Sequence, residues 1–257
     1  MNFLKKYYTL QSNNKNVVNI TKALLFALSI TVFATSCSKR VDYTQEYMEQ
    51  TTGRYLYNQE NFIDVYYENK KLLINWGGLK VIEPVIIDDK TFFIADIYQK
   101  LHFVQHPETK KRYLSVISEE NENLISYDYL KVNDTYKTPS MHLDSGDYEK
   151  ALAGYLEIKE QDSTSALIDE GDFNSLGYRL LRDKKYDDAV EVLKMNTVLF
   201  PESSNVYDSL ADAYLAKGDS LQAFNNFKKT LEYNKNNDKA KRFVEAFNSS
   251  KTKKPLQ

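Results

Sequence analysis

Hydrophobic and polar residues alternate from about residue 52 to residue 130, which is the period of β-strands. In "FIDVYYE" (62–68), for example, Ile63, Val65 and Tyr67 share one face. Similar runs occupy residues 71–76, 91–95, 100–105 and 112–118, with turn-like "ENKK", "IDDK" and "HPETK" between runs. Short strands with tight connections predict an antiparallel meander, because parallel strands need long crossovers. The pattern does not distinguish a β-sandwich from a β-barrel, and Trp76 would lie in the core of either.

From Asp147 the period becomes helical, and a repeat of 34 residues appears. Four positions recur at that offset: Leu176, Gly177, Ala189 and Pro201 correspond to Leu210, Ala211, Ala223 and Lys235. The spacing is typical of tetratricopeptide repeats, in which two antiparallel helices pack through small residues. We therefore expect Ala189 and Ala223 at the closest contacts between paired helices. The predicted fold class is α+β, an antiparallel β-meander (a curved sheet or small barrel) followed by an α-helical tetratricopeptide-repeat array.

Two repeats alone bury little apolar surface, so flanking segments must cover the ends of the array. Residues 146–160 repeat the second-helix pattern, but the half before them contains Pro139 and makes a poor first helix. Residues 240–247 have the helical spacing of a terminal cover. The predicted units are an antiparallel β domain (52–130), a connector and capping helix (131–170), the repeat domain (171–248) and a disordered tail (249–257).

The N-terminal 36 residues have the order of a secretory signal: a basic stretch, the apolar run "ALLFALSITVF" and the small residues before Cys37. The apolar run is shorter than the roughly 20 residues that a membrane-spanning helix needs. Cys37 is the only cysteine of the chain, and its context resembles the lipobox of bacterial lipoproteins, most closely those of Bacteroidota. The alternative is an ordinary cleaved signal with a chance cysteine. We expect a signal peptide at 1–36, lipid such as palmitate on Cys37, a polar tether at 37–51, and attachment to the outer membrane, either periplasmic or surface-facing.

Charge and cysteine content narrow the possible partners. Residues 1–36 hold four lysines and no acid, so the rest of the chain has a formal charge of −6, against −2 overall. A net acidic body without a basic stripe argues against nucleic-acid binding. One cysteine permits neither an intramolecular disulfide nor a cysteine-rich zinc site. No cofactor is predicted.

The segments "LGYRLL", "AVEVLKMNTVLFP" and "NVYDSLADAYLAKGD" resemble the C-terminal accessory region that follows the catalytic domain of Bacteroidota β-lactamase-like serine hydrolases. The likeness covers roughly residues 50–248 and implies an accessory module. Such hydrolases need an S-x-x-K pair and a K-T-G strand. The S-x-x-K matches begin at Ser12, Ser36 and Ser250, in the leader, across the cleavage site and in the tail, and K-T-G is absent. We therefore predict a protein that is not an enzyme.

Isolated histidines and aspartates offer little further chemistry. His102 and His106 have metal-ligand spacing only on a helix, and the pattern around them is that of a strand and a turn. Asp88 and Asp89 in "IDDK" are most simply turn residues, whose side chains bind the local backbone.

The predicted binding groove lies on the first helices of the repeats. In tetratricopeptide repeats the first helices usually present side chains to a partner peptide. The matching positions of this sequence hold six side chains: Asn174, Tyr178, Arg182, Asn205, Asp208 and Asp212. Asn205 and Asp208 fit a helix cap and first-turn acid equally well, and Arg182 fits a solvated charge.

Three functional hypotheses follow. The first is a lipid-anchored, non-catalytic scaffold or adaptor whose repeats bind a protein or peptide partner. The second, which rests on the resemblance alone, is an accessory subunit of a separately encoded β-lactamase-like serine hydrolase. The third is a hydrolase or a carrier of a small apolar ligand inside the sheet, which is disfavoured because aromatic residues at strand spacing usually form core.

Overall fold

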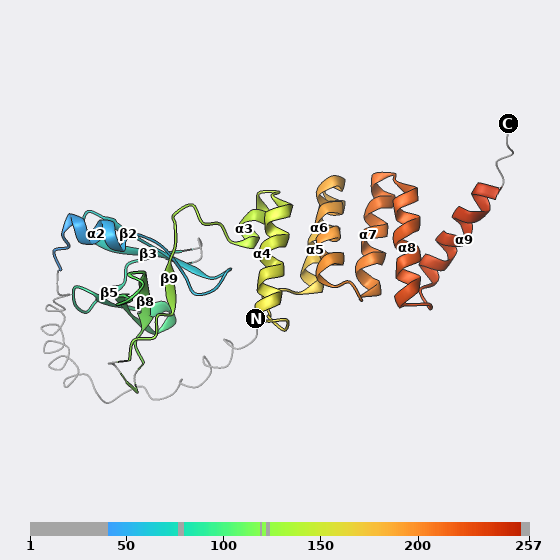
Figure 1. Ribbon diagram of the computed structural model, residues 1–257. Helices are drawn as coiled ribbons and strands as arrows, with labels where there is room; N and C mark the ends of the chain where they lie inside the picture. The colour runs from blue at the N-terminus through green and yellow to red at the C-terminus, as the bar shows by residue number, and fades with distance from the viewer. Residues whose placement is uncertain (1–40, 77–79, 119, 122–123, 253–257) are drawn as a thin grey trace, which may run out of the picture.

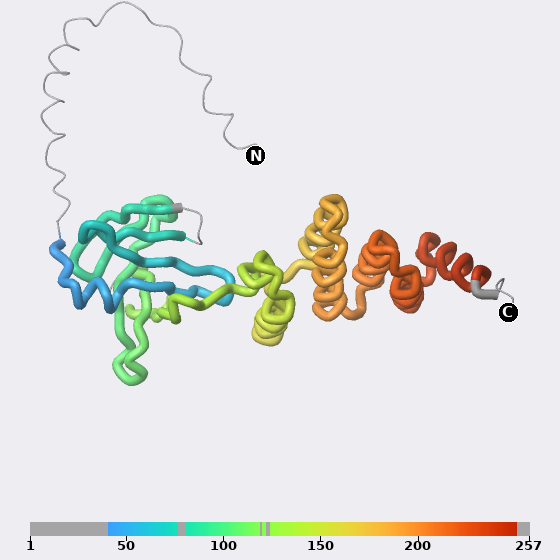
Figure 2. Tube along the Cα trace, turned by 90° about the horizontal axis from the view of Figure 1, so that it is seen from above, coloured from blue at the N-terminus to red at the C-terminus, as the bar shows by residue number. Residues whose placement is uncertain are grey.

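The computed structural model describes residues 41–252 except 77–79, 119 and 122–123. A curled β-sheet forms one part of the molecule, and a row of helices extends away from it (Figure 1). Seen from above, the helices continue in the same direction, so the described part of the chain is elongated (Figure 2). The predicted α+β order, antiparallel sheet first and helical array second, is confirmed.

The sheet contains nine antiparallel strands in the described residues: β1 (Gly53–Leu56), β2 (Phe62–Glu68), β3 (Lys71–Trp76), β4 (Lys80–Ile82), β5 (Val85–Ile86), β6 (Thr91–Ile94), β7 (Gln99–Gln105), β8 (Arg112–Val116) and β9 (Tyr129–Lys131). Their order is β4-β3-β2-β1-β9-β8-β7-β6-β5. Strands β1 to β4 form one antiparallel meander and strands β5 to β9 form a second, so every pair of consecutive strands except β4 and β5 is adjacent in the sheet. The first and last strands also pair, Tyr55 opposite Lys131 and Leu56 opposite Leu130.

The two edge strands of this sheet, β4 and β5, are consecutive in sequence. Only Glu83 and Pro84 separate Ile82 from Val85, a stretch that spans at most about 11 Å. The two edges must therefore lie close together, and the sheet curls into a half-barrel. The buried Pro84 lies at the break, where its missing N–H removes a donor that a continuous ladder would need.

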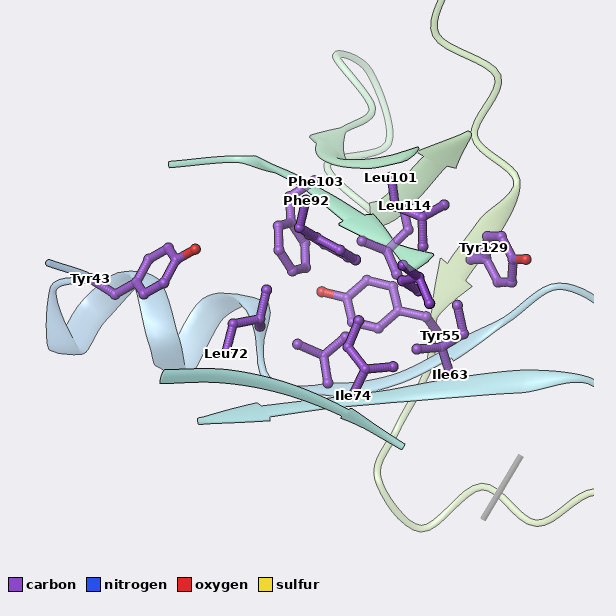
Figure 3. Packing of buried hydrophobic residues seen from close by; sticks show 12 residues of the cluster. Tyr43, Tyr55, Ile63, Leu72, Ile74, Phe92, Leu101, Phe103, Leu114 and Tyr129 are labelled. Atoms are coloured by element: carbon purple, nitrogen blue, oxygen red, sulfur yellow. The ribbon is translucent and has the colours of Figure 1, made fainter. Parts of the chain in front are cut away.

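The inward faces of the strands form one hydrophobic core (Figure 3). Tyr55, Ile63 and Ile74 are completely buried. Tyr43 lies at one end of this cluster, beside a helix, and Tyr129 lies toward the other end (Figure 3). The core therefore runs from one end of the half-barrel to the other.

Helix α2 (Gln45–Thr51) covers the end of the half-barrel near Tyr43. Tyr47 and Met48 of this helix pack against the core, and the Tyr47 ring meets Phe103 edge-on at 6.1 Å. The prediction of a polar tether is therefore wrong for residues 45–51. The segment folds because the half-barrel supplies an apolar surface that covers its few aromatic and apolar side chains.

The connector joins the sheet to the helices through α3 (Pro139–Asp144) and α4 (Tyr148–Gln161). Pro139 occupies the first turn of α3, where a missing N–H costs no hydrogen bond, so the expected poor first helix does form, with six residues. The Glu60 carboxylate accepts hydrogen bonds from Ser140 N at 2.8 Å and Ser140 Oγ at 2.5 Å. Arg54 binds Asp64 with two N–H groups and also donates to the Tyr136 carbonyl. These contacts join the hairpin of β1 and β2 to the connector and to α3.

Five helices complete the described chain: α5 (Glu170–Arg182), α6 (Tyr186–Leu199), α7 (Ser204–Lys217), α8 (Ser220–Tyr233) and α9 (Asp238–Thr252). The pairs α5/α6 and α7/α8 form the two predicted repeats. Ala189 and Ala223 are completely buried, as expected for close helix contacts. A Cβ on Gly177 would lie 2.6 Å from Leu193 Cγ, so glycine permits the approach of α5 and α6. Helix α9 reaches residue 252, and the predicted disordered tail is therefore wrong for residues 249–252.

Candidate binding surface of the helical repeats

The first helices of the two repeats, α5 and α7, carry the six predicted groove residues, and α9 adds Lys239 to the same surface. Residues four apart, such as Asp208 and Asp212, lie on the same side of a helix. Local signals set where these helices begin and end: Asp169 accepts a hydrogen bond from Asp172 N at 3.0 Å at the start of α5, and Gly218 ends α7 with a φ of 89°, which favours glycine. We use the term α5–α7–α9 face for the surface formed by Tyr178, Asn205, Asp208, Asp212 and Lys239.

Three helices meet on this face through one cluster of charged and polar side chains. Tyr178 of α5 donates its hydroxyl hydrogen to Asp212 Oδ2 of α7 at 2.8 Å. Lys239 of α9 donates to Asp212 Oδ2 at 2.8 Å and to Asp208 Oδ2 at 2.5 Å. Asn237 Nδ2 donates to Asp208 Oδ1 at 3.0 Å. The structure therefore brings together Tyr178, Asp208 and Asp212, three of the six predicted residues.

The cluster shifts the pKa of its two ionisable donors. Burial lowers the pKa of Lys239, but hydrogen bonds to Asp208 and Asp212 outweigh that effect and raise it above its ordinary value. Burial also raises the pKa of the Tyr178 hydroxyl, and the hydrogen bond to Asp212 adds to the increase. Lys239 is therefore charged and Tyr178 neutral at neutral pH. Two carboxylates share one ammonium group, which leaves this position with a local excess of negative charge.

Asn174 does not lie open on the face. Its side chain is 8% exposed, and its Oδ1 accepts a hydrogen bond from Asn196 Nδ2 of α6 at 3.1 Å. Asn196 Nδ2 also donates to the Glu170 carbonyl at 3.0 Å. Asn174 thus joins the two helices of the first repeat. The offset of 34 could not reveal this role, because the partner lies on a second helix.

Asn205 is not the cap of α7. The helix begins at Ser204 after the N-cap Ser203, so Asn205 already lies in the first turn. Its Nδ2 donates instead to Glu170 Oε1 of α5 at 2.8 Å, a contact between repeats. Capping is thus the wrong interpretation for Asn205 and Asp208. Arg182 is exposed in the last turn of α5, where a positive charge interacts favourably with the helix dipole.

Lys239 is the important residue of the face that the sequence analysis did not select. It follows Asn205 by 34 residues, so extension of the repeat into α9 would have found it. The apolar spacing of residues 240–247 predicts only a terminal cover for this helix.

The remaining candidates have local structural roles. His102 lies in β7, and its Nδ1 is 2.8 Å from Thr91 Oγ1. Asp88 Oδ1 accepts hydrogen bonds from the backbone N–H groups of Lys90 and Thr91, which confirms the turn interpretation. Within the described residues, no group of three or more His, Cys, Asp or Glu side chains could hold a metal ion.

Several predicted positions lie outside the described residues. They include Cys37, the signal peptide and the S-x-x-K pairs that begin at Ser12 and Ser36. In the part of the chain that the structure describes, none of the helices combines the length and the apolar character needed to span a bilayer.

Comparison with known proteins found no matching family model and no matching curated protein. Solved structures do match. The first TPR domain of Spaghetti (RPAP3) bound to an HSP90 peptide has 17% identity and a TM-score of 0.31, over 44% of this chain and 87% of that one. A point mutant of MamA has 24% identity and a TM-score of 0.33, over 44% of this chain and 80% of that one.

The Yersinia enterocolitica type III secretion chaperone SycD, in complex with a peptide of the translocator YopD, has 20% identity and a TM-score of 0.31. That match covers 44% of this chain and 88% of the chaperone.

Proposed function

We propose that this protein is a non-catalytic scaffold that binds a protein or peptide partner on its α5–α7–α9 face while lipid on Cys37 holds it at the outer membrane. The observation that carries the proposal is the pair of carboxylates, Asp208 and Asp212, that share the single ammonium group of Lys239. Each carboxylate can accept about four hydrogen bonds. The pair therefore keeps both acceptor capacity and negative charge for a ligand.

Contacts between helices hold these acceptors in place before a ligand arrives. Asp212 is bound from α5 and α9, and its side chain is 27% exposed. Asp208 is bound from α9 and is 16% exposed. Groups that are already ordered lose little conformational entropy on binding. The face therefore suits a peptide that presents a lysine or arginine, whose cation would compete with Lys239 for the two carboxylates.

The test compares variants of the full chain in a crosslinking pull-down from native membranes. Asp212→Asn keeps the shape but removes a charge, and we expect it to weaken capture by about tenfold or more, since truncation of a hydrogen-bonded charge costs at least about 1.4 kcal/mol. Lys239→Met removes the internal competitor, and we expect stronger capture. A role of this cluster in folding alone predicts weaker capture for both variants.

Asp187→Asn is the matched control, because Asp187 forms an ion pair with Lys217 between α6 and α7, outside the α5–α7–α9 face. It should capture the same partners as the wild type. Equal capture by Asp212→Asn and the wild type would refute the proposed face. Circular dichroism of each variant establishes that the helices are intact.

The membrane anchor is tested separately. Several acyl chains on one cysteine anchor stably, at roughly 0.8 kcal/mol per buried methylene. We expect Cys37→Ala to release the protein from the membrane fraction and to abolish incorporation of an alkyne-labelled fatty acid. Retention of the variant in washed membranes would refute the anchor but would not affect the argument for the helical face.

The accessory-subunit alternative rests on the sequence resemblance alone. It predicts that the purified protein changes the turnover or substrate affinity of a β-lactamase-like serine hydrolase from the same organism. No change in either quantity would exclude it.

A further inference from the structure

The half-barrel has two different ends. Helix α2 covers the end near Tyr43. At the opposite end lies a cavity of about 340 Å³, between the β1–β2 turn, the last residue of β3 and the first residues of β7 and β9. Its lining includes Tyr57, Asn61, Phe62, Trp76, Gln99 and Tyr129. The mouths of β-barrels are common places for small-molecule sites, and this volume is at the lower end of their usual range.

The aromatic residues of the cavity continue the inward faces of their strands. Trp76 follows the buried Leu72 and Ile74 at intervals of two residues, and Tyr57 follows the buried Tyr55 in the same way. Yet Tyr57 is 59% exposed, whereas Tyr55 is completely buried. The core therefore ends in aromatic side chains that are only partly covered.

These aromatic rings stand at an angle to one another. The ring centroids of Tyr57 and Tyr129 are 5.2 Å apart with an interplanar angle of 43°. Those of Trp76 and Tyr129 are 6.5 Å apart at 70°. Tyr129 is itself buried, so the ring surface that a ligand can reach is that of the exposed Tyr57 and the partly buried Trp76.

The polar side-chain groups of the cavity are uncharged: the amides of Asn61 and Gln99 and the hydroxyl groups of Tyr57 and Tyr129. Gln99 Oε1 accepts a hydrogen bond from the Tyr129 hydroxyl at 3.4 Å, and Asn61 Nδ2 donates to Asn58 Oδ1 at 3.0 Å. These contacts fix the two side chains, and each amide group can form further hydrogen bonds. The lining contains no Asp, Glu, Lys, Arg or His, so nothing in it would compensate the desolvation of a charged ligand.

We propose that this cavity binds one pyranose ring of an uncharged saccharide. A pyranose combines an apolar face of C–H groups with hydroxyl groups around its edge. The apolar face would lie on the rings of Tyr57 and Trp76, and the hydroxyl groups would reach the amides of Asn61 and Gln99. The mixture of aromatic faces and amides favours this chemistry over a purely apolar ligand, which would leave the amides without partners.

The single tryptophan of the chain makes the test direct. With excitation near the red edge of tryptophan absorption, the fluorescence of the full-length protein reports on Trp76 alone. It would be titrated with methyl glucoside, methyl galactoside, methyl mannoside, N-acetylglucosamine, cellobiose and maltose. We expect saturable changes with at least one of them, with a Kd on the order of 1 mM, as suits one ring in a small open site.

Two variants locate the binding. Tyr57→Ala removes an exposed ring that contributes little to the core, and we expect it to raise the Kd about tenfold, equivalent to about 1.4 kcal/mol. Tyr233→Ala on α8 removes a similarly exposed tyrosine from the other part of the molecule and should leave the Kd unchanged. Saturation-transfer NMR with each saccharide provides a second measurement that does not depend on fluorescence.

Several outcomes would overturn the proposal. They are no saturable signal by either method, an unchanged Kd in Tyr57→Ala, or saturable binding of tetramethylammonium or a short alkyl alcohol but of none of the saccharides. The outcome is independent of the α5–α7–α9 face, since its variants leave this cavity unaltered.

Discussion

The close packing of α5 against α6 gives the sharpest stability prediction. An added methyl group on Gly177 would lie 2.6 to 2.9 Å from three carbon atoms of Leu193, which is itself completely buried. Such overpacking costs about 1 to 3 kcal/mol, and the better helix propensity of alanine returns about 1 kcal/mol. We expect Gly177→Ala to lower the free energy of unfolding by about 1 kcal/mol.

The same contact predicts that the effect changes sign in a second background. Leu193→Ala alone should cost about 2 to 5 kcal/mol, because it removes a buried side chain and leaves a cavity. In that background the Gly177→Ala methyl group has space, partly fills the cavity and adds helix propensity. We therefore expect the double variant to be more stable than Leu193→Ala by about 1 kcal/mol, which gives a coupling energy of about 2 kcal/mol.

The assay is urea denaturation of the four proteins, followed by far-ultraviolet circular dichroism, which reports mainly on the helical array. Ser175→Ala, at an exposed position of the same helix, controls for propensity and should stabilise by no more than about 0.5 kcal/mol. Additive effects, or a Gly177→Ala protein as stable as the wild type, would refute the close contact between α5 and α6.

Three further predictions concern other parts of the molecule. Asp169→Ala removes the side-chain acceptor of the Asp172 N–H and should lower the free energy of unfolding by about 1 kcal/mol in the same assay. Burial raises the pKa of Tyr129 to about 12, so its stabilising contribution is complete below the unfolded pKa of about 10 and is lost as pH rises through the folded value. In an alkaline titration, the part of the tyrosinate absorbance that comes from buried tyrosines such as Tyr129 should therefore follow that of the exposed tyrosines and appear together with the loss of folded structure. Glu60→Gln weakens the charge-assisted hydrogen bonds to Ser140 and should speed limited proteolysis of the connector, as mass spectrometry of the fragments would show.

Local periodicity predicted the longer elements, and non-local pairing determined the rest. Five apolar runs correspond to β2, β3, β6, β7 and β8 within two residues at either end. The strands β4, β5 and β9 have only two or three residues, too few for a pattern, and the four-residue β1 begins with Gly53, which has a low strand propensity. The pairing of β1 with β9 joins Tyr55 to Lys131 across most of the domain, and this pairing turns the meander into a curled sheet.

The candidate face was predictable to the extent that it follows the repeat. The offset of 34 correctly relates Tyr178 to Asp212, which are hydrogen-bonded. It could not show that the side chain of Asn174 binds Asn196, because whether this side chain lies at the surface or in the interior depends on how α5 packs against α6. Helix α2 was missed for a similar reason, since its polar sequence folds only against the end of the half-barrel.

The point at which the chain enters the half-barrel determines which way both proposed surfaces would face relative to the membrane. Cys37 precedes Val41, the first described residue, by four residues, which can reach at most about 14 Å. With lipid on Cys37, as proposed, the end covered by α2 would therefore be held close to the bilayer.

The helical array extends away from this end in both views (Figures 1 and 2). The aromatic cavity also lies at the end opposite α2, beside the turn that contacts the connector. Both surfaces would then be directed away from the membrane, so ligands in the surrounding aqueous compartment are better placed to reach them than lipids of the anchoring bilayer.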